Sequence, residues 1–330
     1  MPHKYIIRRK IATSDKPKYN YYYNNSDKKI TDEKLLKQLY SIYIAPAYTD
    51  VKIYLKKDVL ATGIDSAGRK QYIYSELSKK KRELKKYNQL IELSDKIISL
   101  KKKINKDLLS TQFDKNKMIA LILKIMDMCN FRCGNKVYEK KYGSYGLTTL
   151  HKKHVKINPN NVKISFIGKK GVLNECIIKN KKVQDIIKKM YSMSNKKEPY
   201  IFSLIKDGNN VNVSVQDVNK YLEEFNITSK NLRTWNANVI FIENFKKEVD
   251  QNLDKTYFAL TDNTKKENIK KKLIKEAIYN TSHSLHHTPT ICKSSYIYKN
   301  ILSEILQNDN IVKKLYHKEV DYEDFLKSIL

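Results

Sequence analysis

Five side chains of the types that can break and rejoin a phosphodiester are spread along this sequence. Tyr296 lies nine residues after His287, and Arg132, Lys169 and Arg233 lie far upstream. A tyrosine oxygen can attack phosphorus, while two arginine forks, a histidine and a lysine can hold phosphate oxygens and supply a proton. Together these residue types can cut and rejoin a nucleic-acid strand without a metal ion or a nucleotide.

Each of these side chains also has a purely structural explanation. Arg132 could be a surface arginine at the end of a helix, Lys169 a solubilising residue in a turn, and Arg233 a support for the neighbouring tryptophan. Tyr296 is one of 24 tyrosines, and Tyr298 nearby would face another direction on a helix. Their local sequences alone therefore do not decide between structure and catalysis.

The charge of the chain favours a polyanionic partner. Lys and Arg number 65 against 35 Asp and Glu, which gives a net charge of +30 on a chain that is 41% hydrophobic. Such an excess on a globular protein indicates nucleic acid. A membrane surface fits less well, because the lysines are spread through the chain and no basic amphipathic helix carries a Trp/Phe face.

The sequence predicts an intracellular protein without a membrane span. Its first residues contain no apolar signal core, and no run of about 18 apolar residues occurs. Four cysteines in a chain of this length do not form a disulfide framework, so we expect reduced thiols. They are Cys129, Cys133, Cys176 and Cys292.

The elements that must position the five side chains fall into two expected domains. Residues 1–78 are predicted to form a small β-rich domain that clamps DNA, with one or two helices, one of them over Thr31–Tyr40. Residues 79–330 are predicted to be mainly helical, beginning with a basic helical run. The expected strands of the first domain are Lys4–Ile11, Lys18–Tyr23, Asp50–Leu55, Leu60–Asp65 and Arg69–Tyr74.

Within the second domain each candidate is expected near the end of an element. A helix ending near Asn130 precedes Arg132, and a hairpin over Val162–Ile178 carries Lys169 at its tip. Thr288-Pro289 is expected to stop a helix directly after His287. Tyr296 is then expected in the first turn of the following helix, or in the loop that leads to it.

Two other patterns are rejected on their spacing. Gly63–Lys70 nearly matches a phosphate-binding loop, but Arg69 replaces the essential lysine, Lys70 replaces the hydroxyl, and a strand is expected to follow. Cys129 and Cys133 with two histidines faintly resemble a zinc finger, but His151 and His154 are too closely spaced. We therefore expect neither a nucleotide site nor a metal site.

Taken together, the motifs resemble those of the type IB DNA topoisomerases, in the compact form encoded by poxviruses and other large DNA viruses. The resemblance covers nearly the whole chain, with the motifs in order and at the family's spacing. The matching segments are Ile44–Val51, Gly68–Tyr74, Gly146–Leu150, Phe166–Lys169, Leu232–Thr234 and His287–Pro289.

The resemblance implies a catalytic set of Arg132, Lys169, Arg233, His287 and the nucleophile Tyr296. It also implies a set of residues that contact DNA: Arg69, Lys70, Gln71, Tyr72, Tyr74, Lys136, Tyr138, Lys230 and Asn238.

Two positions depart from the family pattern: His286 stands where the family commonly has glycine, and relatives often carry arginine near Ser294.

The implied fold is α+β, with a small β-rich N-terminal domain and a larger, mainly helical domain that contains a small hairpin or sheet, as in tyrosine recombinases and type IB topoisomerases. The implied activity is relaxation of supercoiled DNA through transient single-strand cleavage, a 3′-phosphotyrosyl intermediate, swivelling and religation. The resemblance implies no ATP, metal or other cofactor. It further implies a monomer that acts on double-stranded DNA in the virion or the cytoplasmic viral factory.

Two alternatives remain open at this point. Tyrosine recombinases use similar catalytic groups, but they usually carry histidine where this chain has Lys230, and their N-terminal domain is helical rather than β-rich. An architectural DNA-binding protein would explain the charge. It would not explain five catalytic residue types in register.

Overall fold

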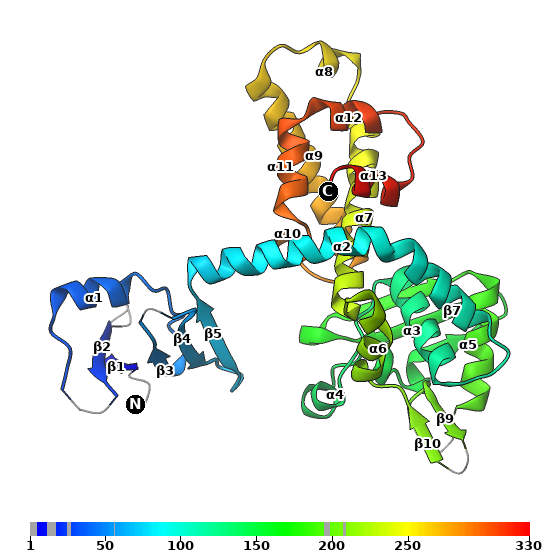
Figure 1. The fold of residues 1–330 in the computed structure, drawn as a ribbon, viewed down its shortest axis with the longest axis horizontal. Coiled ribbons are helices and arrows are strands. Elements are labelled where there is room, and N and C mark those ends of the chain that lie inside the picture. The colour runs from blue at the N-terminus through cyan, green and yellow to red at the C-terminus, as the bar shows by residue number, and fades with distance from the viewer. Residues whose placement is uncertain (1–4, 12–17, 25–27, 56, 195–198, 207–208) are drawn as a thin grey trace. The chain divides into compact units, whose positions relative to one another are not determined.

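The computed structural model describes residues 5–11, 18–24, 28–55, 57–194, 199–206 and 209–330 (Figure 1). The chain divides into two compact units, Met1–Asn88 and Gln89–Leu330. Helix α2 (Glu76–Leu109) runs through the division, which lies ten residues after the boundary expected at residue 78. Each unit has a hydrophobic core of its own.

The N-terminal unit is built on a five-stranded antiparallel sheet of order β2-β1-β3-β4-β5. Its helix α1 (Glu33–Tyr40) is capped by Asp32, whose carboxylate accepts from the Leu35 amide. The strands are β1 (Ile6–Ile11), β2 (Lys18–Tyr23), β3 (Thr49–Ile53), β4 (Val59–Ile64) and β5 (Lys70–Tyr74). The unit is β-rich with one helix of its own, where one or two were expected, and most of its element ends lie within one to two residues of those expected.

A tight turn connects β4 to β5. Gly68 has a φ of 72°, a value that favours glycine, and its amide donates to the Asp65 carbonyl at 2.9 Å. The Asp65 carboxylate accepts from the backbone amides of Ala67 and Arg69. The residues that resemble a phosphate-binding loop are therefore a hairpin turn followed by a strand, as expected.

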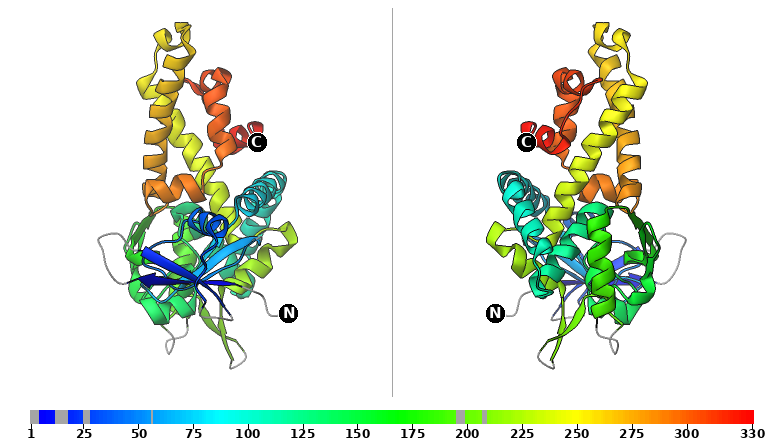
Figure 2. Two further views of the ribbon diagram at one scale, coloured as in Figure 1. Left: turned by 90° about the vertical axis from the view of Figure 1, so that its left-hand side faces the viewer. Right: turned by 90° about the vertical axis from the view of Figure 1, so that its right-hand side faces the viewer.

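The larger unit is mainly helical, and α5 (Lys181–Met193), α6 (Val215–Leu222) and α7 (Ser229–Asn252) contact α3 (Lys115–Cys129), most of whose residues are buried. Helices α7 and α9 (Asn263–Ser284) pack along each other, yellow and gold in Figure 2. Trp235, Phe241 and Phe245 of α7 are fully buried and form much of the core. The fold class predicted from the sequence is confirmed.

A hairpin with lysines at its tip was the one non-helical part expected in this unit. The structure confirms this hairpin and adds a third strand to it. Strands β7 (Val162–Ile167) and β8 (Leu173–Ile178) are antiparallel, and β6 (Val155–Ile157) adds a third strand to the sheet. A short 3₁₀ turn over Lys169–Gly171 joins β7 to β8.

The segment around Tyr296 differs from the sequence-based expectation. Helix α9 ends at Ser284, so His287 lies in the turn beyond it rather than at the helix end. Pro289 does not stop α9 but begins a further helix, α10 (Pro289–Ser295), because a proline lacks the amide that is unpaired at the first helical position anyway. Tyr296 is the C-terminal cap of α10 and precedes α11 (Lys299–Gln307).

Several shorter elements were not anticipated. Their bounds are α4 (Lys136–Tyr142), β9 (Ser203–Lys206), β10 (Asn209–Asn212), α8 (Lys255–Ala259) and α12 (Asp309–Leu315). The remaining helices of this unit, which was expected to be mainly helical, are α5 (Lys181–Met193), α6 (Val215–Leu222) and α13 (Tyr322–Ser328). In the part of the chain that the structure describes, no helix has the length and apolarity to cross a membrane.

Candidate active site

The end of α3 positions Arg132. The helix ends at Asn130, which adopts the left-handed conformation with a φ of 54° and turns the chain out of the helix. Phe131 is fully buried, and the Arg132 carbonyl accepts from the Leu147 amide at 2.9 Å. A Cβ at Gly146 would lie 2.7 Å from that carbonyl oxygen, so only glycine allows this close approach. Backbone packing therefore fixes the base of the Arg132 side chain.

Arg233 is held in the first turns of α7, and only 3% of it is exposed. Its Nη2 donates to the Leu285 carbonyl at 2.6 Å, and its Nε donates to the Tyr296 hydroxyl at 3.4 Å. Burial, followed by the charge of Arg132, lowers the pKa of the Arg233 guanidinium to about 10, so the group remains cationic at neutral pH. Its Nη1 is buried without a partner among the described residues.

Tyr296 receives hydrogen bonds from both arginines. Its hydroxyl accepts from Arg132 Nη2 at 3.1 Å and from Arg233 Nε at 3.4 Å, and the residue is 8% exposed. Burial by itself would raise the pKa of the phenol, but the charges of Arg233 and Arg132 and their hydrogen bonds outweigh it and lower the pKa. The surroundings thus favour the phenolate, which is the nucleophilic form.

His287 lies against the nucleophile candidate. Its ring stacks on the Tyr296 ring, with centroids 4.8 Å apart and planes 18° from parallel. Its Nδ1 is 3.3 Å from the Thr288 carbonyl, which can only accept, so the Nδ1 of a neutral ring carries the proton. Burial, followed by the charges of Arg233 and Arg132, lowers the pKa of His287 to about 4. Its Nε2 is buried and has no partner among the described residues.

Asn238 holds the backbone around Tyr296 instead of facing solvent. Its Nδ2 donates to the carbonyls of Thr234 at 2.7 Å and Tyr296 at 2.9 Å, and its Oδ1 accepts from the Tyr298 amide at 3.2 Å. Because the side chain is fully buried and both ends of its amide are used, the expected DNA contact of Asn238 is not available in this structure. Its position on α7 makes it a positioning residue.

Lys169 lies at the rim of this cluster. Gly168 precedes it, and a Cβ there would lie 2.4 Å from the side-chain Nδ2 of Asn174, which donates to the Val172 carbonyl, so a larger residue would force that side chain to shift. Partial burial of the ammonium group, followed by the charge of Arg132, lowers the pKa of Lys169, while Tyr296 opposes the shift. No described contact joins Lys169 to Tyr296, so the two groups interact through their charges in this structure.

Four of the residues expected to contact DNA lie on strand β5: Lys70, Gln71, Tyr72 and Tyr74. A fifth, Arg69, lies in the turn just before the strand. Arg69 Nε and Gln71 Nε2 both donate to Asp65, at 2.9 and 2.8 Å, and Arg69 is also ion-paired with it. Tyr72 is exposed, and its ring stacks on that of Tyr74 with centroids 6.3 Å apart. The ammonium group of Lys70 lies 5.5 Å from the centroid of the Tyr72 ring. The strand therefore presents cations and aromatic faces together.

Helix α4 carries a second surface of this kind, with Lys136 and Tyr138 exposed on it. The helix is fixed by Glu139, which bonds His151 Nε2 at 2.6 Å and accepts from the Tyr200 hydroxyl at 3.0 Å. These three residues come from separate parts of the chain, so no local sequence signal could have identified their network. Lys230, the remaining expected contact, is exposed at the start of α7.

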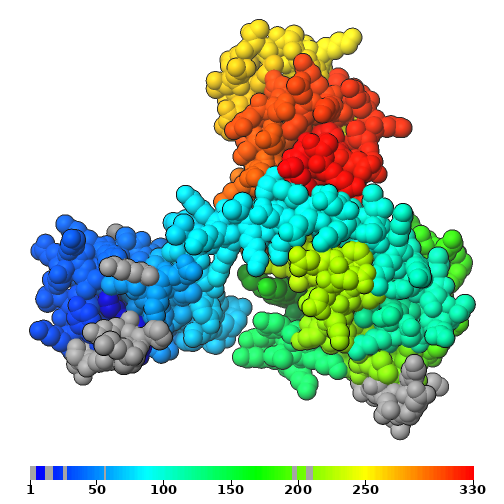
Figure 3. Space-filling view, viewed as in Figure 1, coloured from blue at the N-terminus to red at the C-terminus, as the bar shows by residue number. Residues whose placement is uncertain are grey.

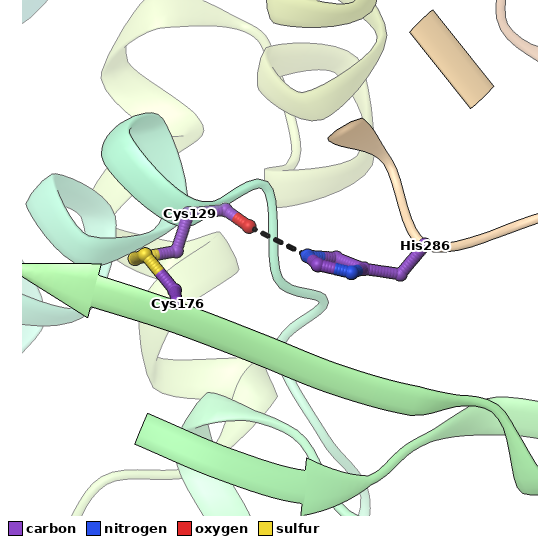
Figure 4. The surroundings of a disulfide bond; sticks show 3 residues. All are labelled: Cys129, Cys176 and His286. Carbon is purple, nitrogen blue, oxygen red and sulfur yellow. Dashed lines mark hydrogen bonds between the residues drawn. A yellow bond between two sulfur atoms is a disulfide. The ribbon is translucent and has the colours of Figure 1, made fainter. Parts of the chain in front are cut away.

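The cysteines contradict the expectation of reduced thiols. Cys129 and Cys176 form a disulfide, while Cys133 and Cys292 are free and buried (Figure 4). The bond forms because the end of α3 packs against β8, which brings together cysteines 47 positions apart. Of the residues that resemble a zinc finger, Cys129 is cross-linked, and His154 Nδ1 accepts from the His151 amide.

Comparisons with known proteins identify the family to which this chain is similar. Residues 75–320 match the family described as eukaryotic DNA topoisomerase I, catalytic core. A DNA topoisomerase 1B of Acanthamoeba polyphaga mimivirus is 32% identical over 95% of this chain and 91% of its own length. The DNA topoisomerase 1B of Vaccinia virus (strain Copenhagen) is 26% identical over 91% of this chain and 90% of its own.

Proposed function

The chain belongs to the family of type IB DNA topoisomerases, and we propose that it relaxes supercoiled DNA through a covalent 3′-phosphotyrosyl intermediate. The observation that carries this mechanism is the convergence of Arg132 and Arg233 on the Tyr296 hydroxyl, with the His287 ring stacked beside it. Two fixed cations around a buried phenol suit attack on a phosphodiester.

In the proposed cleavage step, the bond between the Tyr296 oxygen and phosphorus forms while the bond from phosphorus to the deoxyribose O5′ breaks. The phenolic proton is released, and the O5′ takes up a proton as it leaves. The DNA strand remains attached to the protein through its 3′ phosphate. Religation is the same exchange in reverse. Because one phosphate ester replaces another, no ATP is needed to reseal the strand.

Arg132 and Arg233 support the transition state in this scheme. Negative charge builds up on the non-bridging oxygens during attack, and a guanidinium presents a planar pair of donors to such oxygens. The buried Nη1 of Arg233, unpartnered among the described residues, is a donor ready for one of them. His287 Nε2 supplies a further donor once the ring is protonated. These fixed cations take the part that a metal ion would otherwise play.

Lys169 is proposed as the acid that protonates the leaving O5′. An alkoxide leaves poorly, so proton delivery speeds cleavage. The lowered pKa of Lys169 makes its proton easier to give up near neutral pH. Its position on a hairpin tip, held by the tight Gly168 bend, allows the ammonium group to reach a bound DNA backbone.

Duplex DNA is the proposed partner of both units. In the N-terminal unit, β5 presents Lys70, Tyr72 and Tyr74, and every residue of the basic run Lys79–Lys86 at the start of α2 is exposed (Figure 3). In the larger unit, α4 presents Lys136. Lysine contacts to phosphates give strong, salt-sensitive binding that is largely independent of sequence. We propose a monomer that needs no nucleotide or metal.

The viral origin of the similar proteins supports a place in the virion or the cytoplasmic viral factory. Site-specific recombination, which uses similar catalytic groups, is disfavoured by Lys230 and by the five-stranded N-terminal sheet.

Relaxation of a supercoiled plasmid in EDTA, without ATP, tests the proposed function directly. The wild-type protein should relax the plasmid, and on a DNA strand labelled at its 5′ end it should retain the label covalently. Tyr296→Phe should bind DNA but form no adduct, whereas the matched control Tyr298→Phe should form one. An adduct in Tyr296→Phe would place the nucleophile elsewhere, and an inactive wild-type protein would refute the mechanism.

A further inference from the structure

His286 occupies a backbone conformation that favours glycine. It follows Leu285, the C-cap of α9, and its φ is 53°, in the left-handed region. A histidine side chain is disfavoured there by its Cβ. Histidine is among the residues that adopt this region more readily than most, and the contacts of its side chain indicate what the residue does here.

The His286 side chain reaches the end of α3. Its Nε2 lies 3.2 Å from the carbonyl oxygen of Cys129 (Figure 4). Its ring packs against the ring of Phe131, with centroids 5.3 Å apart. Because a carbonyl only accepts, the His286 Nε2 carries the proton and donates. Cys129 is the last residue of α3, so its carbonyl is one of those that the helix itself leaves unpaired.

The anchoring point of His286 is itself fixed. Cys129 is cross-linked to Cys176 of β8, and Phe131 is fully buried directly before Arg132. On its other side, the same turn is held by the bond from Arg233 Nη2 to the Leu285 carbonyl. The turn that ends in His287 is thus held between the segments that carry the two arginines.

We propose that His286 is a positioning residue for the cleavage step. By holding the turn against the Cys129 carbonyl, it sets the His287 ring over the Tyr296 ring and keeps His287 in register with Arg132. This role rests on the proposed function, because it acts through His287 and the nucleophile.

A neutral imidazole suits this task. Burial lowers the pKa of His286, and the charges of Arg233 and Arg132 act in the same direction, while the bond to the Cys129 carbonyl opposes the shift. A neutral ring donates its single proton to the carbonyl and adds no further positive charge beside the two guanidinium groups.

His286→Gly tests the role without straining the turn, because glycine prefers the observed backbone conformation and only the side-chain tether is lost. Under single-turnover conditions the rate constant for covalent adduct formation should fall by about 10- to 100-fold, as expected when a reacting group is misplaced by a fraction of an ångström to an ångström. DNA affinity and the thermal unfolding midpoint should stay close to those of the wild-type protein.

Two further variants separate positioning from a general structural effect. His286→Gln places an amide donor at a similar reach and should recover a large part of the lost rate. His283→Ala, at an exposed histidine near the end of α9, should leave the rate unchanged. A rate for His286→Gly equal to that of the wild-type protein would overturn the proposal, as would a loss confined to DNA affinity.

A double-mutant cycle with His287→Ala gives the decisive readout. If His286 acts through His287, adding His286→Gly to His287→Ala should reduce the rate by less than about 2-fold, because the group to be positioned is already gone. Multiplicative losses would show an independent structural role and refute the proposal. Adduct formation by the wild-type protein is measured alongside, so that failure of the proposed function is distinguished from failure of this role alone.

Discussion

The Nη2 of Arg132 lies 3.1 Å from the hydroxyl oxygen of Tyr296, although 164 positions separate the two residues in the chain. Arg132 extends from the segment after α3, and Tyr296 caps α10, so the contact depends on the packing of the whole larger unit. The pair joins the proposed nucleophile to a group that can stabilise both its phenolate and the phosphate it attacks.

Replacing Arg132 with alanine should slow DNA cleavage by about 10²- to 10³-fold, the loss typical of removing one donor to a developing oxyanion. Arg132→Lys should recover little of this loss, because an ammonium group cannot present the planar pair of donors. Single-turnover adduct formation at saturating protein measures both rates. Full activity in Arg132→Ala would remove this residue from the proposed mechanism.

Binding of DNA should be accompanied by proton uptake at His287. In the free protein its pKa is about 4, so the ring is neutral at pH 6, with Nδ1 holding the proton. A phosphate oxygen beside Nε2 favours the protonated ring and raises this pKa. Affinity should therefore increase as the pH falls from 7 to 5.5.

Calorimetric titrations in buffers of different ionisation enthalpy measure the number of protons taken up. His287→Gln should reduce that number by most of one proton, while His283→Ala should leave it unchanged. Equal proton uptake by His287→Gln and the wild-type protein would contradict this assignment.

His154 should make the fold sensitive to acid. Burial, followed by the charges of His151 and Lys153, lowers its pKa from 6.5 to about 4, and its Nδ1 accepts from the His151 amide. The unfolded chain therefore binds a proton at a higher pH than the folded chain does. Stability is fully retained above pH 6.5 and is lost as the pH falls towards 4.

The urea midpoint at pH 7.5 and at pH 5 measures this loss. A His154→Gln variant should show a smaller difference between the two pH values than the wild-type protein, even though it loses the native ring packing at both. An unchanged difference would assign the acid sensitivity to other groups.

Reduction of the Cys129–Cys176 bond should lower the free energy of unfolding by about 2–4 kcal/mol, as expected for a cross-link that closes a loop of 47 residues in the unfolded chain. Cys176→Ser should show the same loss in urea without reductant. Adding reductant to Cys176→Ser should change nothing further. A wild-type protein whose midpoint is insensitive to reductant would argue that the thiols are unpaired in solution.

Asn238→Ala should separate positioning from DNA contact. Loss of the amide leaves the Tyr296 carbonyl and the Tyr298 amide unpaired in a buried site, which should destabilise the fold by about 1–3 kcal/mol. Cleavage should slow while DNA affinity stays unchanged. Tyr138→Ala, at an exposed ring on α4, should instead weaken binding and leave the rate at saturating protein intact; the reverse pattern would exchange the two roles.

The sequence by itself was enough to identify the residue types and their order. Charge indicated a polyanionic partner, and the alternation of apolar residues predicted the strands and the hairpin that carries Lys169, because these signals are local. The tight turn at Gly68 is likewise a local feature, because a glycine readily takes the positive φ that it needs. The segments Gly68–Tyr74, Phe166–Lys169, Leu232–Thr234 and His287–Pro289, taken together with the other matching segments and in order, were sufficient to indicate the family.

Only the tertiary structure decided how these groups meet. Of the two positions expected for Tyr296, it chose the connection before α11 rather than the first turn of that helix, and it placed the residue at the end of α10, because Pro289 begins a helix where the sequence alone suggested a stop. The structure also shows that Asn238 is buried and that Cys129 forms a disulfide with Cys176. The burial of a side chain and the distance between two cysteines depend on packing between segments far apart in the chain. The contact between Arg132 and Tyr296 depends on that packing, and so does the hydrogen bond from His286 to the Cys129 carbonyl.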